Sequence, residues 1–239
     1  MRTVAVVQAR MGSNRFPGKV MCELAGRPLI EWVLSRVILS TRVDHTVLAT
    51  TDSGLDDSLA RYAAELGVAV YRGDEHDVLG RVACAADEAG AELVVRVCAD
   101  NPFVDPGEID RLIEFFCSRE TDYACNHQDR SGSGYPDGFG AEILSMGLLG
   151  HLDVHTKDPY HREHVTQYLW HNSERFSLSP VPAPPELANA NLRFDVDVPA
   201  DLVRLDAFLK RSSLGIGASA AQIVEAANGD ACEGISVGS

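Results

Sequence analysis

The sequence has no long hydrophobic run and no paired cysteine motif. No stretch of about 18 uncharged apolar residues occurs, so we expect no membrane-spanning helix. None of the six cysteines belongs to a C-x-x-C pair, and several stand inside apolar runs, which favours reduced and mostly buried thiols. The apolar run after Arg2 stops at Gln8 and is too short for an export signal, so we expect a cytoplasmic protein.

Positive charge is also scarce, except near the start. The 239 residues include 21 Lys and Arg against 35 Asp and Glu, which gives a net charge of −14. This balance argues against a general nucleic-acid binder, because a phosphate backbone attracts basic surfaces. Residues 1–42 nevertheless hold seven Lys and Arg and only two acids. The local excess of positive charge suggests a site for a small anion.

Short apolar runs alternate with helical patterns over the first 120 residues. We expect strands at Thr3–Gln8, Thr46–Thr50, Val68–Tyr71 and Leu93–Cys98. We expect helices at Leu29–Ser40, Asp56–Leu66, Val78–Ala89 and Pro106–Ser118. This alternation predicts an α/β protein with a mostly parallel sheet between two layers of helices, a three-layer α/β/α fold.

The pattern changes after residue 120. We expect strands at Tyr123–Asn126, Glu142–Ser145, Phe176–Val181 and Leu192–Val196, and a loop at His127–Gly140. We expect helices at Tyr160–His171, Pro199–Leu209 and Ala218–Ala227. Because no long linker or internal repeat is present, we expect one domain over residues 1–210 and a partly flexible C-terminal tail over 211–239.

The first strand leads into a loop that combines glycine, a hydroxyl and positive charge. Gly12 and Ser13 let backbone N–H groups approach a ligand, while Arg10, Arg15 and Lys19 supply charge. In open α/β sheets ligands bind where such loops leave the carboxyl ends of the strands. The loop is either a phosphate cradle or merely basic, and its spacing excludes a P-loop.

As a whole, residues 9–19 resemble the A-R-x-G-S-x-R-x-P-x-K signature of the sugar-nucleotide cytidylyltransferases. That family includes the acylneuraminate and 3-deoxy-manno-octulosonate cytidylyltransferases, and the likeness is closest to its spore-coat-polysaccharide branch. Further segments follow in the order of that branch, over roughly residues 1–210: 49–52, 71–74, 77–81, 100–102, 135–138, 162–166 and 195–201. Two positions depart from the family pattern, Ala99 in place of glycine and Gly140 in place of an acid.

The resemblance implies a nucleotide-diphospho-sugar transferase fold, similar to glycosyltransferase A. It also implies Mg²⁺-dependent transfer of CMP from CTP to an acidic sugar, a phosphonate or a phosphate, with release of pyrophosphate. Residues 120–190 would bind this acceptor and pair two chains into a homodimer. The departure at Gly140 lies in the region that faces the acceptor and leaves the acceptor's identity open.

The resemblance assigns site residues to two groups. The implied nucleotide-binding residues are Gln8, Ala9, Arg10, Gly12, Ser13, Lys19, Thr51, Asp52, Arg72, Asp77 and Arg81, of which Arg10 and Lys19 would also be catalytic by offsetting phosphate charge. The implied acceptor-binding residues are Tyr135, Glu142, Arg162, Glu163 and His164.

Two aspartates are the candidate Mg²⁺ ligands. Asp100 follows a buried strand, and Asp197 ends the run Leu192–Val196. Mg²⁺ takes a few carboxylates together with water and phosphate oxygens, and the resemblance implies the same pair. Asp195 lies two residues earlier and should point away from Asp197. The other interpretation is that Asp197 simply caps the helix that begins at Pro199.

Three further interpretations stay open. Asp195 and Asp197 could form the D-x-D metal motif of a glycosyltransferase that uses a nucleotide sugar. The chain could also be a nucleotide sensor or scaffold without catalysis. His161 and His164 lie three residues apart and could bind zinc, although no third ligand is evident.

Overall fold

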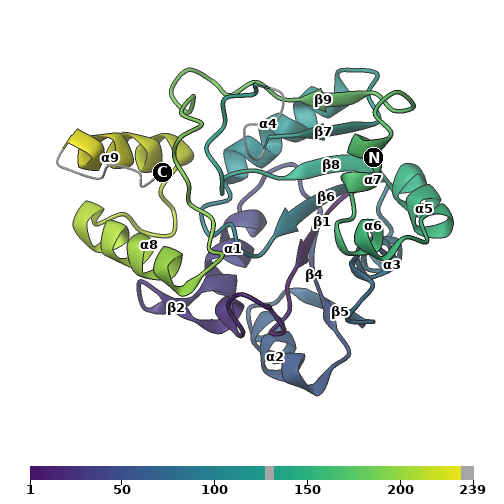
Figure 1. Ribbon diagram of the computed structural model, residues 1–239, viewed down its shortest axis with the longest axis horizontal. Helices are drawn as coiled ribbons and strands as arrows, with labels where there is room; N and C mark the ends of the chain where they lie inside the picture. Colours follow the sequence, from purple (N-terminus) through teal and green to yellow (C-terminus); the bar gives the residue numbers. More distant parts are fainter. Residues whose placement is uncertain (127–131, 233–239) are drawn as a thin grey trace.

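A mixed seven-stranded sheet forms the centre of the protein (Figure 1). The computed structural model describes residues 1–126 and 132–232. Across the sheet the strands run in the order β5 (Ala69–Gly73), β4 (His45–Thr51), β1 (Thr3–Gln8), β6 (Leu93–Cys98), β8 (Glu142–Ser145), β7 (Tyr123–Cys125) and β9 (Leu178–Pro180). The first four are parallel, β8 runs antiparallel to both of its neighbours, and β9 is parallel to β7. A two-stranded hairpin, β2 (Glu23–Leu24) and β3 (Arg27–Pro28), precedes the first long helix.

Helices cover both faces of this sheet. One face carries α1 (Leu29–Ile38), α2 (Asp57–Glu65) and α4 (Pro106–Cys117), and the other carries α3 (Val78–Glu88), α5 (Met146–His155), α6 (Pro159–Glu163) and α7 (Gln167–His171). Alternate residues of β1 enter the two cores: Ala5 and Val7 pack on the first face, and Val4 and Val6 on the second. Strands buried on both sides therefore read as continuous apolar runs, and the predicted three-layer fold is confirmed.

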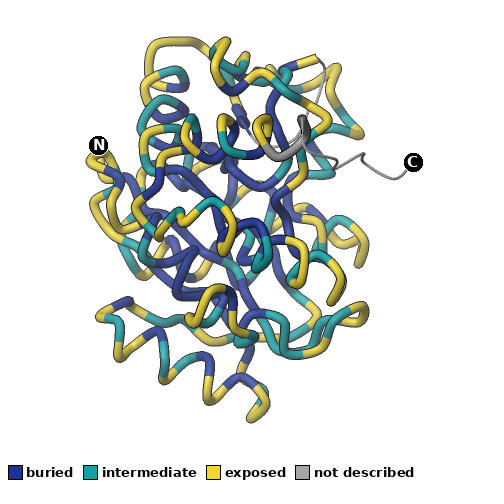
Figure 2. The backbone as a smooth tube through the Cα atoms, turned by 90° about the vertical axis from the view of Figure 1, so that its left-hand side faces the viewer, coloured by how far each residue is buried: buried dark blue, intermediate teal, exposed yellow. Residues whose placement is uncertain are grey.

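A third hydrophobic cluster lies beyond the sheet, under α8 (Pro199–Ser212) and α9 (Ala220–Cys232). Phe103, Phe194 and Phe208 meet in it with ring centroids 5.6–6.3 Å apart. Ile223 and Val224 of α9 are buried in the same cluster. The segment that we assigned to the tail thus contributes a helix to the packed molecule, beside α8 in Figure 1. The backbone coloured by burial shows the continuous buried interior (Figure 2).

The eight elements predicted in the first 120 residues are confirmed to within two residues at each end. Two predictions after that point were wrong, and one helix was missed. The segment 160–171 is two short helices, because Val165 is buried and Thr166 turns its hydroxyl to Glu142 at the break between them. Residues 192–196 form only an isolated bridge, from Asp137 to Arg193, and α5 was not predicted. Two glycines weaken the helical signal of α5.

The cysteines and the apolar segments complete the comparison. The five cysteines whose side chains are described carry free thiols. Cys84 and Cys117 are exposed, Cys22 and Cys98 are half-buried and Cys125 is buried, so our expectation of mostly buried thiols was wrong. The first residues of the expected loop, 127–131, lie outside the described residues. Among the helices that the structure describes, none has the length and apolar character needed to cross a membrane.

Candidate active site

A cavity of about 570 Å³ opens at the carboxyl ends of β1 and β6, against the loop over residues 9–19. Because β1 and β6 are neighbouring parallel strands, their carboxyl ends lie side by side at one edge of the sheet. Nine of the predicted site residues line the cavity: Gln8, Ala9, Arg10, Ser13, Lys19, Arg81, Asp100, Glu163 and His164.

The loop is folded back on itself and anchored by a buried acid. Both Ser13 and Gly18 donate their backbone N–H to the Met11 carbonyl, at 2.9 and 2.8 Å. The Met11 N–H itself donates to Asp56 Oδ1 at 2.8 Å. Gly18 has a φ of 73°, a conformation that glycine adopts without strain. The loop therefore keeps its shape through contacts of its backbone and does not need its cationic side chains for this purpose.

Asp56 was not predicted from the sequence. Its carboxylate is buried and also accepts hydrogen bonds from the Thr50 hydroxyl at 2.9 Å and from the Thr51 hydroxyl and N–H at 2.5 and 3.0 Å. Burial alone would raise the pKa of Asp56, but the bonds from Thr51, Met11 and Thr50 outweigh it and hold the pKa below its ordinary value. An ionised acid thus ties the loop to the end of β4.

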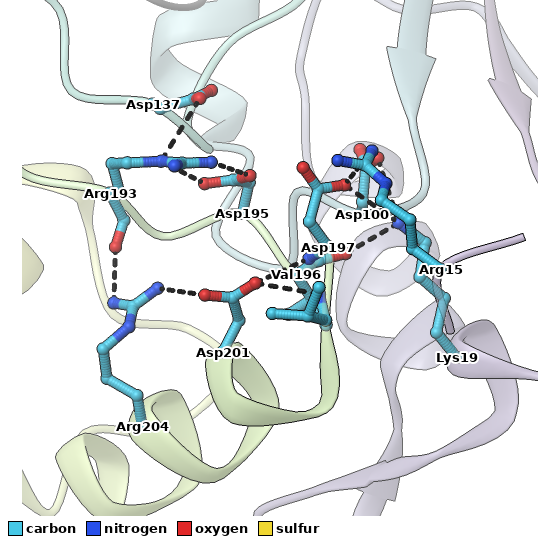
Figure 3. A network of polar contacts seen from close by, with 11 residues as sticks. Arg15, Lys19, Asp100, Asp137, Arg193, Asp195, Val196, Asp197, Asp201 and Arg204 are labelled. Carbon is cyan, nitrogen blue, oxygen red and sulfur yellow. Dashed lines mark hydrogen bonds and ion pairs between the residues drawn. The ribbon is translucent and has the colours of Figure 1, made fainter. Parts of the chain in front are cut away.

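Lys19 lies between the two predicted metal ligands (Figure 3). Its ammonium nitrogen is 3.3 Å from Asp100 Oδ2 and 3.6 Å from Asp197 Oδ1, and it donates to the Val196 carbonyl at 2.7 Å. Arg15 Nη2 reaches the same Asp197 oxygen at 2.8 Å. Residues separated by about 180 positions in the sequence therefore form one cluster of alternating charge.

The carboxylate of Asp197 does not cap α8. Asp201 does so instead, because its Oδ2 accepts from the backbone N–H groups of Asp197 and Val198 at 3.0 and 2.9 Å. These bonds fix the backbone beside the cluster and leave the Asp197 side chain facing Lys19 and Arg15 (Figure 3). The capping interpretation of Asp197 was wrong.

A second cationic group lines the same cavity. Arg10 and Arg81 both donate to the Glu75 carbonyl, at 2.9 and 2.8 Å, and Arg10 also pairs with Glu163 at 2.9 Å. Burial and the nearby Arg10 charge lower the pKa of Arg81. Arg81 Nε has no hydrogen-bond partner among the described residues. An anion would stabilise this pair of guanidinium groups.

Several predicted nucleotide-binding residues lie outside the cavity. Thr51 is buried against Asp56, Asp52 is exposed, and Arg72 donates to the Thr51 and Ser53 carbonyls at 2.8 and 2.7 Å. Gly12 lies outside the cavity lining, and a Cβ added there would come within 2.7 Å of Glu75 Oε1, the end of a flexible side chain.

A predicted nucleotide-binding residue, Asp77, contacts a predicted acceptor-binding residue, Arg162. Asp77, assigned to the nucleotide, accepts from Nε and Nη2 of Arg162, assigned to the acceptor, at 2.8 and 2.6 Å. The hydrogen bonds from Arg162 lower the pKa of Asp77, although burial alone would raise it. This pair joins the start of α3 to α6, next to the cavity.

Two predicted acceptor-binding residues are buried away from the cavity. The hydroxyl of Tyr135 contacts Glu108 and Arg111, and its ring packs in the third cluster. Glu142 pairs with Arg96 inside the sheet and accepts from the Tyr123 and Thr166 hydroxyls at 2.7 and 2.8 Å. Glu142 therefore acts within the framework beneath the site.

Asp195 and Asp197 do not share a site. Asp195 forms a bidentate pair with Arg193, at 3.1 and 2.7 Å, on the side of the chain away from Lys19 (Figure 3). A D-x-D metal motif would need both carboxylates on one ion, so the geometry does not support the glycosyltransferase interpretation.

The donor set of the cavity fits magnesium better than zinc. Over the residues 1–126 and 132–229, no group of three or more His, Cys, Asp or Glu side chains could hold a metal ion. His161 instead places Nε2 at 2.9 Å from His171 Nδ1. Two carboxylates beside a cationic loop suit Mg²⁺, whose shell substrate oxygens and water would complete. Asp100 and Asp197 could hold such an ion.

A parallel sheet whose first loop sets cations against two carboxylates is the nucleotide-binding arrangement of an α/β nucleotidyltransferase. The chain belongs to the cytidylyltransferase family, since the family model described as "Cytidylyltransferase" matches residues 4–194. It is an enzyme of that class, which excludes the interpretation as a mere scaffold.

Individual relatives agree with this assignment. The chain is 28% identical to the spore coat polysaccharide biosynthesis protein SpsF of Bacillus subtilis, over 93% of this chain and 92% of that protein. It is 35% identical to the 3-deoxy-manno-octulosonate cytidylyltransferase of Trichlorobacter lovleyi, over 48% of this chain and 45% of that one. The structure of a cytidylyltransferase from Leptospira borgpetersenii superposes with a TM-score of 0.88 at 27% identity, over 97% and 96% of the two chains. The predicted nucleotide-sugar transferase fold is thereby confirmed.

Proposed function

We propose that this chain transfers CMP from CTP to a small anionic acceptor, with Mg²⁺ held by Asp100 and Asp197. The observation that carries the proposal is the position of Lys19 between these carboxylates, at the mouth of the loop over residues 9–19. A triphosphate in the cavity would meet the Lys19 ammonium and the Arg10 and Arg81 guanidinium groups, which all line it.

The reaction would be an in-line displacement at phosphorus. An acceptor oxygen forms a bond to the α-phosphorus of CTP, the bond to the bridging oxygen breaks, and pyrophosphate leaves. Arg10 and Lys19 would offset the charge that develops on the phosphate oxygens. Catalysis by positioning and charge needs no protein nucleophile, which agrees with the lack of an activated one in the cavity lining.

The two aspartates would have a defined part in this chemistry. When bound, Mg²⁺ would neutralise charge on the phosphates and orient them. Asp100 is at the end of β6 and Asp197 is fixed through Asp201, so both ligands come from anchored backbone. Lys19 would release its contacts with them and donate to the phosphates instead.

The acceptor would enter beside Glu163 and His164, which line the same cavity next to Arg10. We propose an acidic sugar, a phosphonate or a phosphate. The relative from Trichlorobacter lovleyi is named for an eight-carbon acidic sugar, which favours the first. A phosphonate or phosphate would arrive as an anion and need no base, whereas a sugar hydroxyl would have to lose a proton.

A panel of nucleotides and acceptors tests this function directly. CTP, UTP, ATP and GTP would each be incubated with Mg²⁺ and with octulosonate, nine-carbon acidic sugars or small phosphonates, and pyrophosphate release measured. We expect release with CTP and one class of anionic acceptor, and its loss in Lys19→Met. Release of nucleoside diphosphate from a nucleotide sugar, or no turnover with any pair, would contradict the proposal.

We further propose that residues 1–210, with α9 packed against them, act as one domain and that residues 120–190 pair two chains into a homodimer in the cytoplasm. The family resemblance supports this arrangement. Light scattering at micromolar concentration should give the mass of two chains, about twice 25.8 kDa. The mass of one chain would contradict it.

A further inference from the structure

Three polar side chains, Gln8, Arg96 and Glu142, form a network on the second face of the sheet, beyond the last apolar residue that β1 places on that face. On β1 the side chains of Val4 and Val6 enter the second core, and Gln8 is the next residue on that face. Arg96 of β6 lies opposite Glu142 of β8 in the strand register. Arg96 Nε donates to Gln8 Oε1 at 2.8 Å, and Arg96 Nη1 pairs with Glu142.

This contact fixes which way the Gln8 amide points. A guanidinium group has only donors, so the atom of Gln8 that faces Arg96 must be the carbonyl oxygen. The Gln8 NH₂ group then faces the other way, and it has no hydrogen-bond partner among the described residues. Gln8 lines the cavity. The cavity therefore contains a hydrogen-bond donor, the Gln8 NH₂ group, whose orientation is set by Arg96.

The guanidinium group that holds this donor, and the one two residues further along the chain, are both paired with carboxylates. Arg96 is neutralised by Glu142, and Arg10 by Glu163. Burial raises the pKa of the neighbouring Cys98 thiol to about 12, which keeps it neutral. An anionic acceptor would be recognised by cations such as Arg81, whose Nε has no partner among the described residues, so an uncharged group suits Gln8 better.

The position of Gln8 indicates which part of the substrates it meets. It stands two residues before Arg10, at the start of the loop that would bind the triphosphate. The nucleobase is the uncharged part of CTP, and its edge presents hydrogen-bonding atoms. Cytosine offers an acceptor at N3, whereas uracil has an N3–H donor there, which would face the NH₂ group of Gln8 without a bond.

We infer that Gln8 selects cytosine by donating its NH₂ group to the base, and that Arg96 is the positioning residue that fixes this donor. The inference rests on the proposed function and adds the origin of its base selectivity. Glu142, which we expected at the acceptor, acts in this chain by keeping Arg96 charge-paired and in place.

The CTP-to-UTP ratio of kcat/KM tests this inference. In Gln8→Glu, Arg96 keeps a partner but the atom that faces the cavity becomes an acceptor, so the ratio should fall at least tenfold. In Arg96→Lys, a single ammonium cannot reproduce both guanidinium contacts, so the Gln8 amide can turn over and the ratio should fall at least threefold. KM for the acceptor substrate should stay within twofold in both variants.

Tyr123→Phe is the matched control, because it removes one hydrogen bond to Glu142 at the far end of the same network. A loss of general stability would affect all three variants, but only the first two should change the ratio. An unchanged ratio in Gln8→Glu, or a rise in the acceptor's KM with the ratio intact, would overturn the inference.

Calorimetric binding of CMP and UMP gives a readout that needs no turnover. The wild type should bind CMP at least tenfold more tightly than UMP, and Gln8→Glu should lose most of this preference. Equal binding of both nucleotides by the wild type would overturn the inference while leaving nucleotidyl transfer possible. Selective CMP binding without any pyrophosphate release would instead contradict the proposed function alone.

Discussion

Asp56 anchors the loop over residues 9–19, although it does not line the cavity. Its two oxygens accept four hydrogen bonds, one of them from the Met11 backbone. Such a carboxylate is costly to bury and still more costly to replace, because each donor would be left unpaired. The loop's shape therefore depends on a side chain 45 positions away in the sequence.

Asp56→Asn should lower the free energy of unfolding by about 2–4 kcal/mol at pH 7, since an amide cannot accept all four bonds. The pKa of Asp56 is lowered on folding, so its contribution is complete above the unfolded pKa, near about 3.9, and is lost as the pH falls through the folded value. Urea unfolding from pH 7 to pH 3 should show the deficit of the variant shrinking below about pH 4. Asp57→Asn, at an exposed neighbour, should change stability little, and an equal deficit in both variants would be evidence against this role.

Lys19 and Arg15 contact the same oxygen of Asp197 but differ in burial, with 12% and 67% of their side chains exposed. Lys19→Met should lower kcat about 100-fold or more, because a cation that is largely shielded from water stabilises phosphate charge strongly. Arg15→Met should lower it less than about tenfold, since water screens an exposed charge. Steady-state pyrophosphate release measures both, with cooperative thermal unfolding as the check on folding. Equal losses would show that burial does not matter at this position.

Residues 192–196, which precede α8, are held by backbone hydrogen bonds to two loops and not by a place in the sheet. Its hydrogen bonds are divided between two loops: Phe194 N–H donates to the Asp137 carbonyl at 2.8 Å, and Val196 N–H donates to the Asp100 carbonyl at 2.8 Å. Gly138 makes this close approach possible, because its φ is 102° and a Cβ there would lie 2.7 Å from the Phe194 carbonyl carbon.

Gly138→Ala should destabilise the fold by about 2 kcal/mol or more, since it adds backbone strain to a contact with backbone atoms. It should also raise KM for CTP, because the displaced segment carries Asp197. Gly150→Ala is the matched control: this glycine lies in α5 with open space around it, and alanine there should stabilise by up to about 1 kcal/mol. Differential scanning calorimetry would compare the two. A Gly138 variant as stable as the wild type would contradict the packing described here.

The sequence predicts the parts of the fold and site that are continuous along the chain. The buried parallel strands appear as apolar runs, and the loop over residues 9–19 carries its glycines and cations side by side. Asp56 and Arg96 could not be predicted, because their partners are brought to them only by the sheet. Of the seven cations in residues 1–42, Arg36 is buried in the fold and Arg2 lies at the opposite edge of the sheet. The number of cations in this segment therefore overstates the positive charge at the cavity.

At the scale of the whole molecule, Arg36 of α1 joins the C-terminal segment to the loop that follows Asp100. This side chain is 1% exposed and donates to the carbonyl groups of Val104, Ile216 and Ala218, each at 2.7 Å. It also pairs with Asp105 at 3.4 Å, and Asp105 in turn accepts from the Ala220 N–H at the start of α9. The position of α9 and the loop near the site are therefore coupled.

Arg36→Met should lower the free energy of unfolding by about 3–5 kcal/mol, because it leaves the buried Asp105 without its cation and three carbonyl groups without the guanidinium donor. Hydrogen exchange of α9 should rise at the same time. Arg42→Met removes an exposed pair with Glu114 and should change stability by less than about 1 kcal/mol. A small effect of Arg36→Met, with α9 still protected, would show that apolar packing alone holds this helix.

The most direct measurement is a crystal structure grown with CTP and Mn²⁺, with anomalous diffraction recorded at the manganese edge. We expect an anomalous peak at bonding distance from both Asp100 and Asp197, with the Lys19 ammonium moved onto the phosphates and the cytosine next to Gln8. A triphosphate bound elsewhere, or a metal peak that contacts neither aspartate, would contradict the site described here.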